Sequence, residues 1–372
     1  MTVYQPVVSS SLHIPQEVNM ILLRLLFATI VLCLAGTTPL TSSAQPQLSL
    51  PQSSPGATVS QTVGTSTITV SYHRPGVKGR KIWGEVVPYN EVWRAGANEN
   101  TTISFSDPVK IDGKDLPAGV YGLHMIPTEG EWTIIFNRNS TSWGSFFYDA
   151  GEDALRVLTK PEPSEHVEWL EYEFSDLSRS SAKVSLRWEK LRVPFTVEFD
   201  VNNVVLSNAR TSFLRGPAGF TWQGFNQAAN FALQNNIDLQ QGLTWADLSI
   251  SLNENFTNMR TKAGILKKLG RMTEAESLRE ESMKIALEAD VNTMGYEHLA
   301  QNNMKKAIEL FKKNVKDYPK SWNVYDSLGE AYEKDGQMRL AVENYTHALS
   351  MVKDDANRNR ITTILKRLKS KE

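Results

Sequence analysis

The chain has 372 residues, a formal net charge of -1, and 41% hydrophobic and 9% aromatic residues. This length allows two domains with ordinary cores, and the composition is that of a folded protein rather than a disordered one. The near-zero charge argues against nucleic acid as a partner, because neutralising phosphates requires a basic excess.

Residues 1–44 have the pattern of a targeting segment. Arg24 precedes the apolar run LLFATIVLCLA, and small residues, Ser42 and Ala44, follow it. This order predicts a signal peptide cleaved after Ala44, and therefore export to the periplasm or surface of a bacterium. The run is short for a membrane span, which needs about 20 residues, so no stable span is expected after cleavage. An uncleaved anchor is the alternative.

Two further points concern the same segment. Residues 1–19 do not resemble the start of a signal peptide, so Met20 is a candidate start. Cys33 is the only cysteine, and Leu32 before it is too large for a lipoprotein signal. After cleavage the chain would contain no cysteine, which excludes disulfides and thiolate metal sites.

Residues 45–57 form a polar, proline-bearing leader, and residues 58–202 then follow a strand-like pattern. In TSTITVSYH, alternation places Ile68, Val70 and Tyr72 on one side of a half-buried strand. Further short β runs are TTISF, VKI, GVYGLHMI, WTIIF, SFFYD, LRVLT, VEWLEYEF, KVSLRW and FTVEF, with turn residues such as Asp112-Gly113 between several of them. The pattern predicts an all-β antiparallel domain, sandwich-like or barrel-like.

Residues 203–221 are interpreted as a helical linker, and residues 222–372 as helical repeats. Ala307 and Ala341 are about 34 residues apart, the period of the tetratricopeptide repeat, which this part of the chain resembles. The small and large residues at the spacings of that repeat are Gly295, Ala307, Phe311, Pro319, Leu328, Gly329, Tyr332, Ala341, Tyr345 and Ala348. Such an all-α solenoid offers an extended surface to a protein or peptide partner. The alternative is an array that only packs on its own β-domain.

The segment between the predicted strands TSTITVSYH and TTISF is rich in cations and aromatic residues. Arginine forks suit carboxylate, phosphate or sulfate, and flat aromatic rings suit sugar faces or stacking on guanidinium. The candidate residues for a polar or anionic ligand are Arg74, Lys78, Arg80, Trp83, Trp93, Arg94 and Asn98. The alternative is that each arginine pairs with a nearby glutamate or carbonyl while the tryptophans fill the core.

Catalytic signals are weak. Glu91 and Glu99 form a carboxylate pair of the kind that glycoside hydrolysis uses, but such pairs also arise by chance. His73 and His124 lie on separate β segments without a spaced partner, which is a poor metal signal. No nucleophile elbow, phosphate-binding glycine loop or zinc-type motif occurs, so no metal or cofactor is predicted.

The β half resembles a bacterial family known as domain of unknown function 2911. The motifs that carry the resemblance begin with Arg74-Pro75, Lys78-Gly79-Arg80, Ile82-Trp83-Gly84, Val87-Pro88-Tyr89 and Val92-Trp93-Arg94. The resemblance implies an exported β-domain, in some members followed by helical repeats, and no particular reaction. Two departures are visible: Asn90 where glycine is expected, and His124 where an aromatic residue is more common.

The sequence therefore favours an exported protein that acts as a binding and scaffold protein. Its β-domain would hold a polar or anionic ligand, and its repeats would dock a protein partner. Two alternatives stay open at this point. One is a cell-envelope glycan hydrolase that uses Glu91 or Glu99 as acid or base. The other is a structural assembly factor without a small-molecule ligand.

Overall fold

A computed structural model describes residues 50–370 of the chain. The predictions about the signal segment, including Cys33, the start at Met20 and cleavage after Ala44, lie outside the described residues. None of the described helices is both long enough and apolar enough to cross a membrane.

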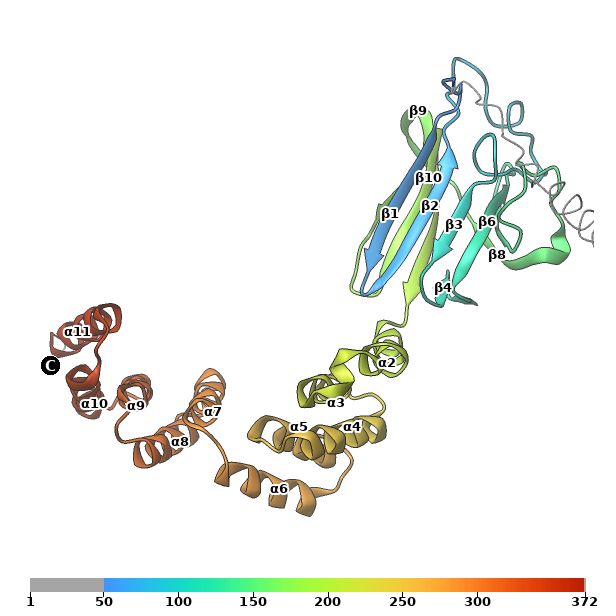
Figure 1. Cartoon of the computed structure of the whole chain (residues 1–372). Coiled ribbons are helices and arrows are strands. Elements are labelled where there is room, and N and C mark those ends of the chain that lie inside the picture. Colours follow the sequence, from blue (N-terminus) through green and yellow to red (C-terminus); the bar gives the residue numbers. More distant parts are fainter. Residues whose placement is uncertain (1–49, 371–372) are drawn as a thin grey trace, which may run out of the picture. The chain divides into compact units, whose positions relative to one another are not determined.

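The first β-sheet has six antiparallel strands in the order β1-β2-β3-β6-β7-β8 (Figure 1). They are β1 (Gly56–Val63), β2 (Ser66–His73), β3 (Thr102–Phe105), β6 (Gly119–Ile126), β7 (Trp132–Asn137) and β8 (Asp153–Thr159). The alternation expected for β2 is confirmed, because Ile68, Val70 and Tyr72 are buried while the residues between them are only partly covered.

The second β-sheet has four antiparallel strands in the order β5-β4-β10-β9. They are β4 (Val109–Ile111), β5 (Lys114–Leu116), β9 (Glu162–Ser175) and β10 (Ser181–Phe199). The turn predicted at Asp112-Gly113 joins β4 to β5, and both residues have positive φ, as a tight hairpin turn requires.

The two sheets share one apolar core. Tyr72 of the first sheet contacts Tyr172 of the second with ring centroids 4.8 Å apart, and Phe136 contacts Phe195 at 5.7 Å. The all-β antiparallel domain is thereby confirmed as two packed sheets, and in the described residues these do not close into a single barrel.

Two details of the strand prediction are wrong. SFFYD is a loop, because Gly144 before it has positive φ and the chain turns there without pairing to a strand. KVSLRW and FTVEF are two parts of the single long strand β10, which continues through a β-bulge near Glu189. Hydrophobic runs alone cannot distinguish a strand from an aromatic loop.

Residues 201–369 form ten α-helices in the described part of the chain. Their bounds are α2 (Val201–Thr211), α3 (Trp222–Asn235), α4 (Leu239–Leu252), α5 (Phe256–Lys268), α6 (Met272–Lys284), α7 (Glu288–Ala300), α8 (Met304–Asp317), α9 (Trp322–Lys334), α10 (Met338–Met351) and α11 (Asp355–Lys369). Two short 3-10 turns, Phe213–Arg215 and Pro217–Phe220, link α2 to α3. From α3 onward, helices pair as a tetratricopeptide array does, which confirms the all-α prediction.

Small residues allow the paired helices to approach closely. Gly295 of α7 faces the ring of Phe311 in α8, and Gly329 of α9 faces the ring of Tyr345 in α10. Phe311 is fully buried and Tyr345 nearly so. The glycines therefore leave the space that the aromatic rings of the next helix fill.

The basic helix α11 closes the array. Its apolar side chains Ile361, Leu365 and Leu368 are buried in the same cluster as α9 and α10. Arg360 donates to Asp326 of α9 at 2.8 Å. The helix thus covers one apolar face of the last repeat with a polar outer surface, as a capping helix does.

Candidate functional site

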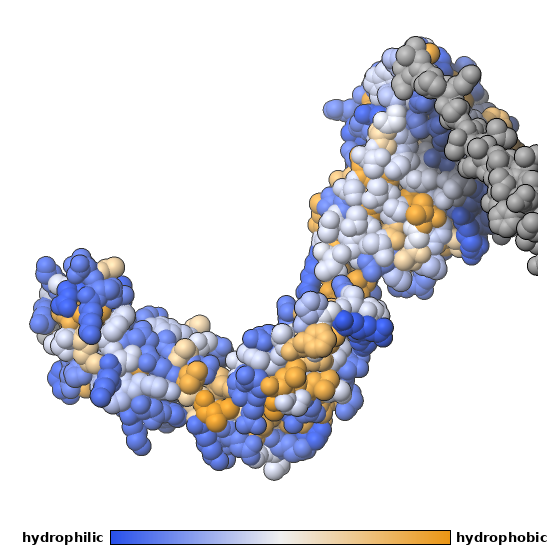
Figure 2. Space-filling view, viewed as in Figure 1, coloured by the Kyte–Doolittle hydropathy of each residue, from blue (hydrophilic) through white to orange (hydrophobic). Residues whose placement is uncertain are grey.

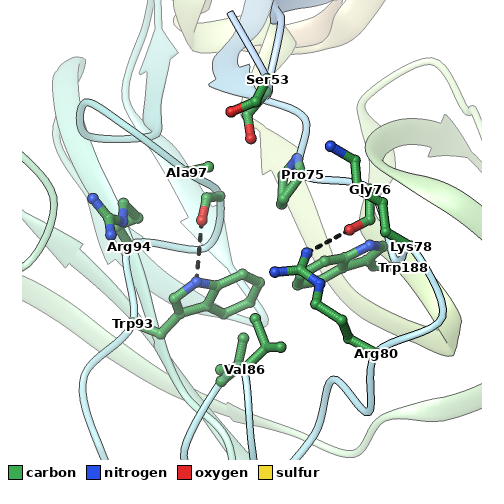
Figure 3. Close-up of a pocket in the computed structure, with 13 residues that line it drawn as sticks. Ser53, Pro75, Gly76, Lys78, Arg80, Val86, Trp93, Arg94, Ala97 and Trp188 are labelled. Atoms are coloured by element: carbon green, nitrogen blue, oxygen red, sulfur yellow. Dashed lines mark hydrogen bonds between the residues drawn. The ribbon is translucent and has the colours of Figure 1, made fainter.

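The segment from residue 74 to 101, between β2 and β3, provides most of the lining of a cavity of about 390 Å³ (Figure 3). We call it the cationic cavity. It is lined by Ser53, Ser54, Pro75, Gly76, Lys78, Arg80, Val86, Val87, Trp93, Arg94, Gly96, Ala97 and Trp188. The structure therefore brings together four of the predicted ligand residues, Lys78, Arg80, Trp93 and Arg94.

Both arginines of the cavity are held by neutral acceptors. Arg80 donates from Nε to the carbonyl of Val77 at 3.1 Å and from Nη2 to that of Gly76 at 2.6 Å. Arg94 donates from Nη1 to the carbonyl of Asn98 at 2.6 Å. Such bonds fix the guanidinium planes and leave the positive charges uncompensated.

Lys78 supplies the third cation. Its Nζ lies 5.7 Å from the ring centre of Trp169, and its backbone amide donates to the Glu168 carboxylate at 2.9 Å. The ammonium itself has no acidic partner among the described residues. The side chain is exposed at the cavity mouth, where it can move toward a ligand.

The cations of the cavity form no ion pair with a carboxylate in the described residues, as is also the case for Arg138 and Arg179 elsewhere in the domain. Burial lowers the pKa of Arg94 from its ordinary value, because an enclosed environment disfavours its charged form. Other arginines of the domain do form ion pairs with carboxylates, among them Arg74, Arg156, Arg187 and Arg192.

Tryptophan rings form the floor of the cavity. Trp93 and Trp188 stack with centroids 6.0 Å apart and ring planes 19° apart, and Trp93 Nε1 donates to the Gly96 carbonyl at 3.1 Å. In Figure 3 the Trp93 indole lies between Arg94 on one side and Arg80 on the other. Trp188 Nε1 is a buried donor without an acceptor in the described residues, which is unusual for a folded protein.

The backbone around the cavity is strained. Lys78, Asn90, Ala95 and Asn98 all have positive φ, at 50°, 65°, 49° and 57°. Non-glycine residues in this region are uncommon and cluster at functional sites. Asn90 is a departure from the family pattern, but asparagine tolerates this conformation, so the turn is preserved.

Three predicted ligand residues have other positions. Arg74 does not line the cavity: it forms an ion pair with Glu171 at 3.1 Å and donates to the Leu170 carbonyl. Trp83 is buried beneath the floor, with its ring centroid 5.9 Å from that of Trp93. The Asn98 carbonyl accepts from Arg94, so this residue supports the cavity wall.

The candidate catalytic carboxylates do not line the cationic cavity. Glu91 is exposed, and Glu99 lies 3.3 Å from Nε2 of His73. Neither therefore faces the three cations. Within residues 50–370, no group of three or more His, Cys, Asp or Glu side chains converges to hold a metal ion.

His124 is buried beside the cavity region. Its Nδ1 lies 2.9 Å from Oγ of Ser145, and its ring centre is 5.3 Å from that of Tyr148. The pKa of His124 is lowered to about 4, mainly by burial and to a smaller extent by Arg94, while Asp153 acts in the opposite direction. The imidazole is therefore neutral at physiological pH.

Sequence reasoning missed several residues of the cavity. Trp188 comes from β10, almost a hundred residues after the segment that provides the cations, and Ser53 and Ser54 come from the predicted leader. Only the pairing of the sheets brings them together. The one signal in the sequence was the tryptophan itself, because Trp188 is a large aromatic residue at the end of the predicted strand KVSLRW.

Comparison with solved structures finds tetratricopeptide proteins. MamA from Desulfovibrio magneticus RS-1 is 16% identical with a TM-score of 0.27, and the match covers 40% of this chain and 84% of that chain. YrrB, described as a tetratricopeptide protein with an unusual peptide-binding site, is 13% identical with a TM-score of 0.26, covering 40% and 75%. The C-terminal part of a repeat-containing protein from Cytophaga hutchinsonii is 14% identical with a TM-score of 0.27, covering 41% and 58%. No curated protein matches the chain.

Family models match both halves, and the order is the one predicted from the sequence. The model described as a tetratricopeptide repeat matches residues 324–358, which include most of α9 and all of α10. The model described as a protein of unknown function (DUF2911) matches residues 54–197, which include nearly the whole two-sheet domain and every residue of the cavity except Ser53. Residues 54–197 therefore match the model of the DUF2911 family, and a match to a tetratricopeptide repeat follows in the same chain.

Proposed function

We propose that the β-domain binds an anionic ligand in the cationic cavity. The observation that carries the proposal is that Lys78, Arg80 and Arg94 line one cavity and that none of their side chains forms an ion pair with a carboxylate in the described residues. Of the three, Arg94 is partly buried, and burying an unpaired cation costs free energy that a ligand with the counter-charge would remove. Lys78 and Arg80 are exposed, so they contribute accessible charge and hydrogen-bond donors. Carboxylate, phosphate and sulfate groups all match the guanidinium forks.

The floor of the cavity limits the ligand further. A cavity of about 390 Å³ has room for more than a bare anion, and pockets for small molecules begin at roughly 300 Å³. Trp93 and Val86 provide apolar wall between the cations. The ligand we propose is therefore an anionic group attached to a ring or an apolar stem.

The helical repeats are proposed to dock a protein partner. Helix pairs of this type form scaffolds for protein interaction, and residues 324–358 match such a repeat. Apolar side chains gather on the surface of the repeats (Figure 2), and Leu248, Leu252, Ile285 and Leu287 are exposed by 42%, 50%, 42% and 65%. Exposed apolar patches of this kind mark contact surfaces.

Export is proposed from the targeting pattern alone. The mature chain would begin at Gln45, after cleavage behind Ala44. Mass spectrometry of the protein from the cell envelope would identify this N-terminus. A chain recovered there with its first 44 residues intact would contradict cleavage.

A thermal-shift screen tests the ligand proposal. The panel contains phosphate, pyrophosphate, sulfate, glucuronate and a neutral sugar. We expect at least one anion to raise the unfolding temperature, and Arg80→Gln to weaken its apparent affinity about tenfold, because one charge-assisted hydrogen-bonding group is lost.

Arg74→Gln is the matched control, since Arg74 pairs with Glu171 away from the cavity. This variant should respond to the anion as the unmodified chain does. If no anion stabilises the chain, or if both variants lose the response equally, the cavity is not the binding site. The structural-assembly alternative would then be favoured. No contact in the described residues supports the hydrolase alternative at this cavity.

A further inference from the structure

The loop from residue 138 to 149, between β7 and β8, exposes three large aromatic side chains. We call it the aromatic loop. Trp143, Phe146 and Phe147 are exposed by 52%, 75% and 71%. Single exposed apolar residues are ordinary, but three within five positions of one loop form a patch that needs an explanation.

The aromatic loop is held in place by its polar residues. Ser145 contacts the buried His124 at 2.9 Å, and the Ser142 carbonyl accepts from the Asn100 amide at 3.3 Å. Tyr148 donates from its hydroxyl to Asp153 at 2.8 Å. The inward-facing side chains thus fasten the loop at several points, so the outward position of the three aromatic rings is fixed by the fold.

The aromatic loop touches the cationic cavity through Arg94. The guanidinium carbon of Arg94 lies 5.7 Å from the ring centre of Phe146. Gly144, with φ at 62°, lies against the same guanidinium: a Cβ at this position would lie 3.0 Å from Arg94 Cζ. Only glycine allows this approach without strain. Arg94 therefore belongs to the lining of the cationic cavity and also contacts the aromatic loop.

We infer that the cationic cavity and the aromatic loop dock together on a membrane whose lipids carry anionic headgroups. The headgroup phosphate occupies the cationic cavity, between Lys78, Arg80 and Arg94, and the three rings enter the interface beside it. The inference rests on the proposed function, because it names the source of the anion. It involves no membrane span.

The chemistry of the exposed side chains favours a lipid surface over an acidic glycan. Phe146 and Phe147 are adjacent in the chain and both project into solvent, so they offer apolar volume and no hydrogen-bonding group. Burying such rings among acyl chains removes their apolar surface from water. Tryptophan prefers the headgroup level, and cations near the surface add attraction to anionic lipids.

The test measures whether the aromatic loop enters the membrane, through the fluorescence of a label placed on it. In the full chain with Cys33→Ser, Phe147→Cys is labelled with an environment-sensitive fluorophore. Vesicles of phosphatidylcholine mixed with phosphatidylglycerol should shift its emission to the blue. With mixed vesicles, the lipid concentration that gives half of the maximal shift should be about tenfold higher when the labelled chain also carries Lys78→Gln/Arg80→Gln. For the labelled chain without these two substitutions, replacing mixed vesicles by phosphatidylcholine alone should raise that concentration at least as much.

Leu177→Cys, labelled in the same way, is the control, because Leu177 is also exposed but lies in the β9–β10 turn. Its emission should not shift, even if the N-terminal apolar run holds the chain on the vesicle. The inference is overturned by an unshifted label at position 147, by equal shifts with neutral and anionic vesicles, or by a response to acidic glycans alone. If soluble anions still stabilise the chain in those cases, the proposed function stands without the membrane.

Discussion

Replacing Gly295 with alanine is expected to destabilise the helical repeats by about 2–3 kcal/mol. A Cβ at this position would lie 2.5 Å from Cζ of the Phe311 ring, closer than carbon atoms pack. The ring is fully buried and has no free space to enter, so helices α7 and α8 must separate. The gain in helix propensity from glycine to alanine, about 1 kcal/mol, is too small to offset this overlap.

Gly329→Ala is the matched control, one repeat later in the array. There the Cβ would lie 3.1 Å from the nearest atom of the Tyr345 ring, which requires only a small displacement. We expect its effect to stay within about 1 kcal/mol, because propensity and overlap nearly cancel. Urea unfolding followed by circular dichroism measures both variants. Equal stabilities would show that the α7–α8 approach does not depend on glycine.

Acid is expected to destabilise the β-domain through His124. The unfolded histidine has a pKa near 6.5, whereas burial holds the folded pKa at about 4. Between these values the unfolded chain binds a proton that the folded chain does not, so stability is lost as pH falls from 6.5 toward 4. The loss amounts to roughly 2 kcal/mol by pH 5 and roughly 3 kcal/mol over the whole interval.

His124→Gln removes the titration and keeps an amide that can contact Ser145. Its unfolding free energy should therefore change less between pH 7 and pH 5 than that of the unmodified chain, by about the amount above. His166→Gln is the control, because His166 is exposed. Chemical denaturation at several pH values gives the slopes. If His124→Gln keeps the full acid sensitivity, other groups cause it.

Much of the fold could be predicted from local patterns in the sequence. Alternation identified β2, and the spacing of Gly295, Gly329 and the alanines identified the helix pairs, because each signal depends only on neighbours along the chain. The aromatic loop shows the limit of this reasoning. SFFYD has the composition of a strand, and only the positive φ at Gly144 and the missing partner strand show that it is a loop.

The cationic cavity was predictable only in part. Composition pointed to Lys78, Arg80 and Arg94, which are close together in the chain. Composition could not separate them from Arg74, whose partner Glu171 lies in β9 and comes near only when the sheets pack. The ion pair between Arg74 and Glu171, which are far apart in the sequence, therefore distinguishes Arg74 from the unpaired cations of the cavity.

Diffraction from crystals soaked in selenate would test the anion site most directly. Selenate resembles sulfate and phosphate in shape, and its selenium atom scatters anomalously. The proposal predicts an anomalous peak in the cavity, within hydrogen-bonding distance of Arg80 and Arg94, that disappears in crystals of Arg80→Gln and persists in Arg74→Gln. Well-diffracting crystals with anomalous peaks only outside the cavity would contradict it.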